Sequence, residues 1–184
     1  MPARAAVSSG DAVPASAGSM PGWHRWLWLS LVVVVVDFAT KQVVLSSFRP
    51  GEVLPVLPVF SLVLAFNPGA AFSFLAGASG WQRWVFTGIA VVASVVIVWL
   101  LRRGGSRLYC AGLALILGGA LGNLWDRITI GQVVDFLLFH WREWSYPAFN
   151  VADSAITVGA ALLILDSFRA RPRDAAPADR KGSR

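Results

Sequence analysis

Charged and amide side chains stand out in this sequence because they interrupt long apolar runs. Asp37 and Lys41 are four residues apart, a spacing that puts two side chains on one face of a helix, where they can pair. Asn123, Asp126 and Arg127 have the spacing i, i+3 and i+4, which also gives one face. Such groups cost on the order of a few kcal/mol each at membrane depth, so they pair, face a bundle interior or serve function.

Two further aspartates have the residue type and the placement that hydrolysis needs. Asp135 lies between the third and fourth apolar runs, and Asp153 follows Asn150 by three residues at the start of the fourth run. Two carboxylates brought close in a site of low dielectric constant share one proton, so one can activate water while the other protonates a carbonyl group. Asp135 and Asp153 fit this division of labour, which is that of an aspartic hydrolase. Asn123 and Asn150 can donate hydrogen bonds there without adding charge.

The same residues also have a purely structural interpretation, in which they only hold helices together. Arg127 directly follows Asp126 and is its expected cationic partner, which favours a scaffolding role for Asp126. Asp37 and Lys41 can likewise form a structural pair. Asp135 and Asp153, taken alone, leave both interpretations open.

Other catalytic chemistries find little support. His24 and His140 are the two histidines and fall on opposite sides of the predicted membrane, which excludes a His-rich metal site. The single cysteine, Cys110, excludes a disulfide framework and a Cys-based metal site, and we expect it to be a small core residue. A serine nucleophile needs a base positioned beside it, and Lys41 is the one candidate base. The sequence therefore gives little support to a serine–lysine mechanism. The segment GGALGN, residues 118–123, indicates close helix packing and no phosphate cradle.

The composition predicts an all-α integral membrane protein. Hydrophobic residues make up 56% of the 184 residues and charged residues 14%, whereas an average soluble domain has about a quarter charged. A helix needs about 20 mostly apolar residues to cross the bilayer core. Four runs meet that length, approximately residues 26–48, 81–101, 108–128 and 148–168.

Basic residues predict how these spans are oriented. They cluster near Arg25, at 102–107 and in the tail 169–184, so both termini are expected in the cytoplasm. This topology accounts for the net charge of +6 better than nucleic-acid binding does. We therefore predict a disordered cytoplasmic tail at 1–22, a membrane domain at 23–168 and a basic cytoplasmic tail at 169–184.

The two outer connections differ in character. Residues 53–66, VLPVLPVFSLVLAF, combine β-branched and aromatic residues with prolines that suit edge strands, which predicts a small extracytoplasmic β-sheet between the first two helices. The second connection, residues 129–147, is expected to be an outer loop carrying Asp135. With this topology the polar groups of four separate segments meet in the outer layer of the membrane.

Five sequence blocks resemble one known family, that of lipoprotein signal peptidase, also called signal peptidase II. The resemblance covers about residues 26–168, and its blocks occur in the family's order. They are DFATK at 37–41, FNPGAAFSFL at 66–75, GGALGNLWDR at 118–127, VVDF at 133–136 and FNVADSAI at 149–156.

This resemblance implies four transmembrane helices, a β-sheet cradle and a mobile element that closes over substrate. The family's catalytic aspartates correspond to Asp135 and Asp153. Residues that position substrate and dyad are implied at Asn67, Asn123, Arg127 and Asn150, and residues that support the fold or the site at Asp37, Lys41 and Asp126.

The substrate that the resemblance implies is a prolipoprotein whose lipobox cysteine already carries diacylglycerol. Cleavage occurs just before that cysteine and uses water, with no metal and no organic cofactor. The implied location is the bacterial inner membrane, with the active site at the periplasmic face, in contact with membrane lipid. We expect a monomer without nucleic-acid partners.

Two rival functions come from other classes. A small proton-coupled transporter or channel also uses intramembrane charges, but the inner halves of the second to fourth spans, including VVASVVIVWL and LYCAGLALIL, are almost wholly apolar and offer no continuous polar path. An assembly or scaffold protein without catalysis is the other rival, and it predicts that Asp135 and Asp153 tolerate replacement by Asn.

Overall fold

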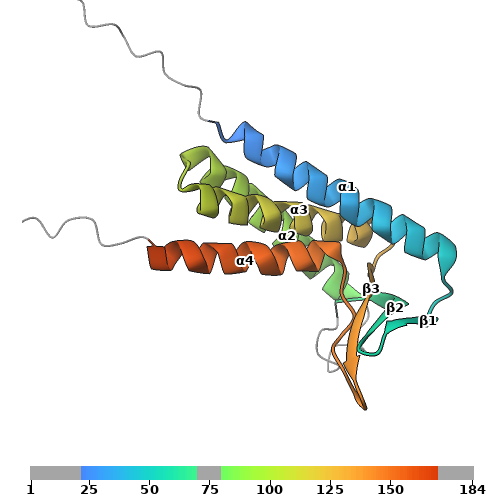
Figure 1. Ribbon diagram of the computed structural model, residues 1–184. Coiled ribbons are helices and arrows are strands. Elements are labelled where there is room, and N and C mark those ends of the chain that lie inside the picture. Colours follow the sequence, from blue (N-terminus) through green and yellow to red (C-terminus); the bar gives the residue numbers. More distant parts are fainter. Residues whose placement is uncertain (1–21, 70–79, 170–184) are drawn as a thin grey trace, which may run out of the picture.

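The computed structural model describes residues 22–69 and 80–169, so the predicted tails and residues 70–75 of the second sequence block lie almost entirely outside the described part. The described chain forms four long helices with a small sheet at one end of the bundle (Figure 1). Its elements are α1 (His24–Ser47), β1 (Val53–Leu57), β2 (Phe60–Asn67), α2 (Trp81–Arg103), α3 (Arg107–Thr129), β3 (Val133–Trp141), β4 (Trp144–Ser145) and α4 (Val151–Arg169).

All four helices are long and apolar enough to cross a membrane, which confirms the predicted spans. Helices suit the lipid interior of a membrane because every backbone N–H and C=O group away from the helix ends is paired within the segment. The fourth helix begins at Val151, three residues later than predicted, and therefore excludes Asn150. Figure 1 shows α1 beginning and α4 ending at the same end of the bundle, opposite the sheet.

Helix α3 is the central element and packs against α1, α2 and α4. Its glycines allow this close approach, as the segment GGALGN predicted. A Cβ atom at Gly118 would lie 2.8 Å from the carbonyl oxygen of Ser30 on α1, and one at Gly112 would lie 2.8 Å from that of Gly159 on α4. At Gly119 a Cβ atom would collide with the carbonyl oxygen of Ala152. The helices therefore pack backbone against backbone, as small residues permit in membranes.

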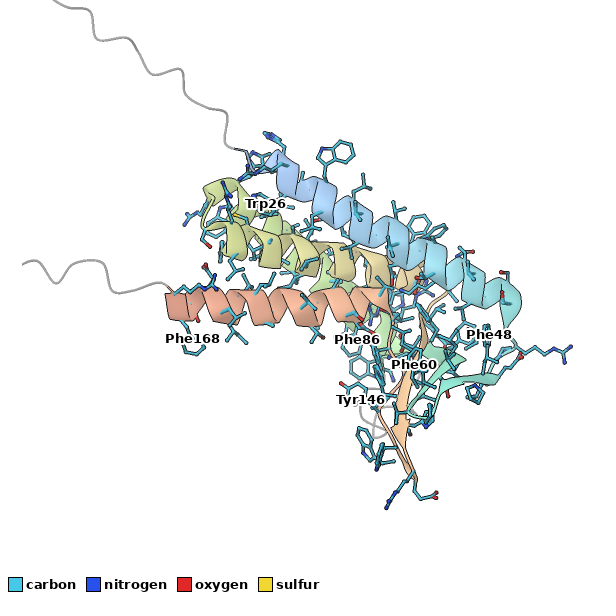
Figure 2. The ribbon with its side chains drawn as sticks, in the orientation of Figure 1. Trp26, Phe48, Phe60, Phe86, Tyr146 and Phe168 are labelled. Carbon is cyan, nitrogen blue, oxygen red and sulfur yellow. The ribbon has the colours of Figure 1, made fainter. Side chains whose placement is uncertain are left out.

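Two apolar clusters lie at the two ends of the molecule. Ile97, Leu101, Cys110, Leu113 and Leu117 form one cluster between α2 and α3, which confirms Cys110 as a buried core residue. The second cluster joins α1 to the sheet through Val44, Leu64, Val134 and Phe136. Figure 2 shows Trp26 and Phe168 at the far end of the bundle and Phe60 and Tyr146 at the sheet end.

The sheet is antiparallel with the strand order β1-β2-β3-β4. It contains the predicted strands of the first connection but also two strands from the second, so the prediction that Asp135 lies in an outer loop is wrong. Residues 133–141, VVDFLLFHW, form a strand because their backbone pairs with β2 and their first four side chains are buried. In this register Ala65 lies opposite Asp135 and Asn67 opposite Val133.

A side chain at Gly119 should disturb the contact between α3 and α4. We expect Gly119→Ala to lower the free energy of unfolding by about 1–3 kcal/mol, because the added methyl group overlaps the carbonyl of Ala152. Reversible unfolding in mixed micelles measures this quantity. Gly88→Ala on α2 is the matched control, since nothing lies within 4 Å of its added Cβ, and it should be neutral or stabilising. Equal effects of the two changes would contradict this packing.

Candidate active site

A buried ion cluster lies between α1 and α3. The Nζ atom of Lys41 is 2.7 Å from Oδ2 of Asp37 and 2.8 Å from Oδ2 of Asp126, and all three side chains are buried. The predicted pairing of Asp37 with Lys41 is therefore confirmed. Arg127 was the wrong partner for Asp126, because adjacent residues of a helix point to different sides.

The two carboxylates of this cluster also bind backbone groups of other elements. Oδ1 of Asp37 accepts a hydrogen bond from the backbone N–H of Ala152, at 2.9 Å, in the first turn of α4. Oδ2 of Asp126 accepts one from the backbone N–H of Val134, at 3.1 Å, in β3. The cluster therefore joins α1, α3, α4 and the sheet. The sequence carries no signal for these two contacts, because every residue except proline offers the same backbone N–H group.

Asp135 and Asp153 come from separate elements. Asp135 is buried in β3, and its two carboxyl oxygens accept hydrogen bonds from Nδ2 of Asn67, at 3.0 Å, and Nδ2 of Asn150, at 2.8 Å. Asp153 is half-buried in the first turn of α4, and its Oδ1 accepts a hydrogen bond from Nδ2 of Asn123 at 2.7 Å. The structure therefore brings three predicted site residues, Asn67, Asn123 and Asn150, into contact with the carboxyl groups of Asp135 and Asp153.

Asn150 links the two aspartates and also shapes the start of α4. Its Oδ1 accepts a hydrogen bond from the backbone N–H of Asp153 at 2.9 Å, the bond that an asparagine makes when it caps a helix N-terminus. Its Nδ2 lies 3.1 Å from Oδ1 of Asn123 and 2.8 Å from Oδ1 of Asp135. One fully buried amide thus fixes where α4 begins and where both carboxyl groups lie.

Arg127 lies beside this network without a salt bridge to Asp135 or Asp153 among residues 22–69 and 80–169. Its Nη1 donates to the backbone carbonyl of Asn123 at 3.2 Å, and its guanidinium group lies 5.4 Å from the centre of the Phe86 ring. Phe86 was not singled out from the sequence, because a single aromatic residue in an apolar span carries no distinguishing pattern.

The pKa of Asp135 rises from its ordinary value of 3.8 to about 7. Burial is the largest cause, because it disfavours the charged carboxylate, and the nearby charge of Asp153 raises the pKa further. Hydrogen bonds from Asn67 and Asn150 and the charge of Lys41 act in the opposite direction. Asp135 can therefore hold a proton near neutral pH while Asp153 lies close by, which is the arrangement that acid–base hydrolysis needs.

The part of the chain that the structure describes contains no group of three or more His, Cys, Asp or Glu residues that could hold a metal ion. His24 is the first residue of α1. His140 lies in β3, where its Nε2 is 2.8 Å from Oγ of Ser61. The two histidines are thus on elements at opposite ends of the bundle (Figure 1).

The family model and the similar relatives agree on one family. The family model described as signal peptidase (SPase) II matches residues 29–169. A lipoprotein signal peptidase of Ralstonia nicotianae is 54% identical over 159 residues, which are 86% of this chain and 92% of that protein. One of Paraburkholderia phytofirmans is 57% identical over 145 residues, which are 78% of this chain and 84% of that protein. A solved structure described as a bacterial membrane enzyme has a TM-score of 0.72 at 26% identity and covers 80% of this chain and 95% of its own.

The raised pKa of Asp135 should appear in the stability of the protein. The folded state keeps a proton that the unfolded chain releases, so this group makes folding less favourable as pH rises from about 4 to 7. We expect Asp135→Asn to raise the melting temperature relative to the original chain above pH 7, and the difference to shrink towards pH 4. Thermal unfolding in detergent across this pH range measures the difference in melting temperature. Glu143→Gln on the exposed hairpin turn is the control, and its difference from the original chain should not vary with pH. A difference that does not vary with pH would contradict the raised pKa.

Proposed function

Since this chain belongs to the signal peptidase II family and cleaves signal peptides from prolipoproteins, we propose that it is an aspartic endopeptidase with Asp135 and Asp153 as its catalytic pair. The observation that carries the proposal is the asparagine network, which holds two carboxyl groups from different elements close enough for the charge of one to raise the pKa of the other. Neither the family nor its relatives support the alternative of a proton-coupled transporter or channel.

The two carboxyl groups have different surroundings, which supports different roles. Asp153 is half-buried and open to water, so it acts as the base that takes a proton from the attacking water molecule. Asp135 is buried and, with its pKa of about 7, carries the shared proton that it gives to the carbonyl oxygen of the scissile bond. Collapse of the tetrahedral intermediate then breaks the C–N bond. The departing amine takes the proton held by Asp153, and one hydroxyl group of the intermediate returns its proton to Asp135, which restores the starting state of the pair. The mechanism uses water as its only co-reactant.

We propose a substrate whose lipobox cysteine carries diacylglycerol, cut just before that cysteine. The pair lies where β3 meets the first turn of α4, at the sheet end of the membrane-spanning bundle (Figure 1). Acyl chains can remain in lipid while the peptide bond reaches the carboxyl groups at the membrane surface. Asn67 and Arg127 lie beside the pair and can contact the peptide backbone, whose carbonyl oxygens accept hydrogen bonds from their N–H groups.

Charge distribution supports a cytoplasmic location for the end opposite the sheet. The guanidinium group of Arg102 lies 5.2 Å from the centre of the Trp23 ring, so the end of α2 adjoins the start of α1. Arg107 and Arg169 line a common pocket where α3 begins and α4 ends. Cytoplasmic ends of membrane proteins are enriched in such residues. We therefore propose an inner-membrane protein with both termini in the cytoplasm and the active site at the periplasmic face. We also propose that it is a monomer.

Labelling of single cysteines tests this orientation. In cells with a permeabilised outer membrane, a maleimide that does not cross the inner membrane should label Glu143→Cys on the hairpin turn and should not label Arg103→Cys at the end of α2. Both positions are exposed, so accessibility differs only by the side of the membrane, and the native Cys110 is buried. The reverse labelling pattern would place the sheet in the cytoplasm.

The catalytic pair is tested by the two nearly isosteric changes Asp135→Asn and Asp153→Asn. Each should lower the rate of cleavage by about 10²–10⁴-fold or more, because an amide can neither share the proton nor accept it from water. A gel-shift assay of a diacylglyceryl-modified prolipoprotein with the purified chain in detergent measures the rate.

Glu143→Gln serves as the matched control, since it removes an exposed carboxylate far along the hairpin and should leave the rate unchanged. Near-normal turnover by either aspartate variant would overturn the assignment and would favour a scaffold role for that residue.

A further inference from the structure

We propose that Lys41 is a positioning residue of the catalytic pair, whose buried ammonium group fixes the orientation of the Asn123 amide and thereby the place of the Asp153 carboxylate. The inference rests on the proposed catalytic role of Asp153. It goes beyond a purely structural role because Lys41 would act on the rate of cleavage without contacting substrate.

The Asn123 amide has two different ends, and each faces a matching partner. Its Oδ1 accepts hydrogen bonds from Nζ of Lys41, at 3.1 Å, and from Nδ2 of Asn150, at 3.1 Å. Its Nδ2 donates to Oδ1 of Asp153 at 2.7 Å. A rotation of the amide by half a turn would bring an acceptor against the carboxylate and a donor against the ammonium group. Lys41, together with Asn150, therefore selects the orientation that supports Asp153.

The ammonium group is itself held in one place. It has three N–H donors, and the three acceptors around it are Asp37 Oδ2 at 2.7 Å, Asp126 Oδ2 at 2.8 Å and Asn123 Oδ1 at 3.1 Å. Because these contacts occupy every donor of a buried group, the two carboxylates direct the remaining N–H towards Asn123. The planar guanidinium group of an arginine has another shape and would not reproduce this arrangement.

Lys41 also acts on the pair through its charge. The charged groups that face Asp135 are Lys41 from α1, Arg127 from α3 and Asp153 from α4. The positive charge of Lys41 opposes the rise in the pKa of Asp135. Loss of this charge would strengthen the hold of Asp135 on its proton, so the decline of activity at high pH should move to higher pH.

The experiment compares Lys41→Met with Ser30→Ala in the full-length chain in detergent. Ser30 Oγ donates to the backbone carbonyl of Ala114 at 2.8 Å, so its loss removes a buried contact between the same two helices away from the pair. Kinetics with a diacylglyceryl-modified prolipoprotein are measured where both variants are folded. For Lys41→Met we expect kcat to fall on the order of 10²-fold with KM nearly unchanged, as for misplaced catalytic groups, and the high-pH limb to shift upwards. Lys41→Arg should not restore kcat, and Ser30→Ala should keep kcat and the pH profile.

A normal kcat and pH profile for folded Lys41→Met would overturn the inference. If Lys41→Met does not fold, Asn123→Asp tests the amide through which Lys41 would act, because it keeps an acceptor for Lys41 but removes the donor to Asp153. A loss of kcat at a normal melting temperature supports the positioning of Asp153 by the Asn123 amide, on which the inference depends, and a normal kcat overturns the inference. Asp153→Asn in the same assay separates the two proposals. If it is inactive while Lys41→Met is normal, only the role of Lys41 fails, and if it is active, the catalytic pair fails as well.

Discussion

The burial of one ammonium group between membrane-spanning helices is the constraint on which the rest of this structure depends. A charge removed from water needs partners, and loss of one partner from a buried ion pair costs about 3–5 kcal/mol. Lys41 meets this need with Asp37 on its own helix and Asp126 on α3. Through the backbone N–H groups of Ala152 and Val134, the same carboxylates hold the start of α4 and the start of β3. The elements that carry the two proposed catalytic aspartates are therefore anchored to one cluster.

Among the described residues, neutral amides and not cations make the direct side-chain contacts to the two proposed catalytic carboxyl groups. Asn67 and Asn150 bind Asp135, and Asn123 binds Asp153, so within the described part of the chain both aspartates have hydrogen-bond donors without a directly bound positive charge. A lysine or arginine bound directly to Asp135 would favour its ionised form and remove the proton that acid catalysis needs. Lys41 is separated from Asp153 by one amide and from Asp135 by two. This separation lets one network hold the site rigidly and still keep a protonated carboxyl group near pH 7.

Close packing of α3 makes this network possible in a chain of modest length. Its glycines bring the backbones of α1 and α4 close enough for short side chains to reach across, and at Gly122 a Cβ atom would lie 2.6 Å from Oδ2 of Asp37. Polar contacts are concentrated at the sheet end, whereas Ile97, Leu101 and Leu113 pack in an apolar cluster towards the other end. The hydrocarbon interior tolerates a few polar groups only where they satisfy one another, which explains this division.

The sequence by itself determined the four membrane spans, because a length of about 20 apolar residues is a local property, and its motif blocks identified the family and the residues that meet at the site. The tertiary structure alone decided how these residues pair. Asp126 binds Lys41 and not its neighbour Arg127, because adjacent side chains on a helix diverge while residues 85 positions apart meet across a helix contact. Asp135 lies in a strand and not in a loop, because its part of β3 pairs with β2, about 70 residues earlier. Backbone partners such as Val134 leave no trace in the sequence, since every residue except proline carries the same N–H group.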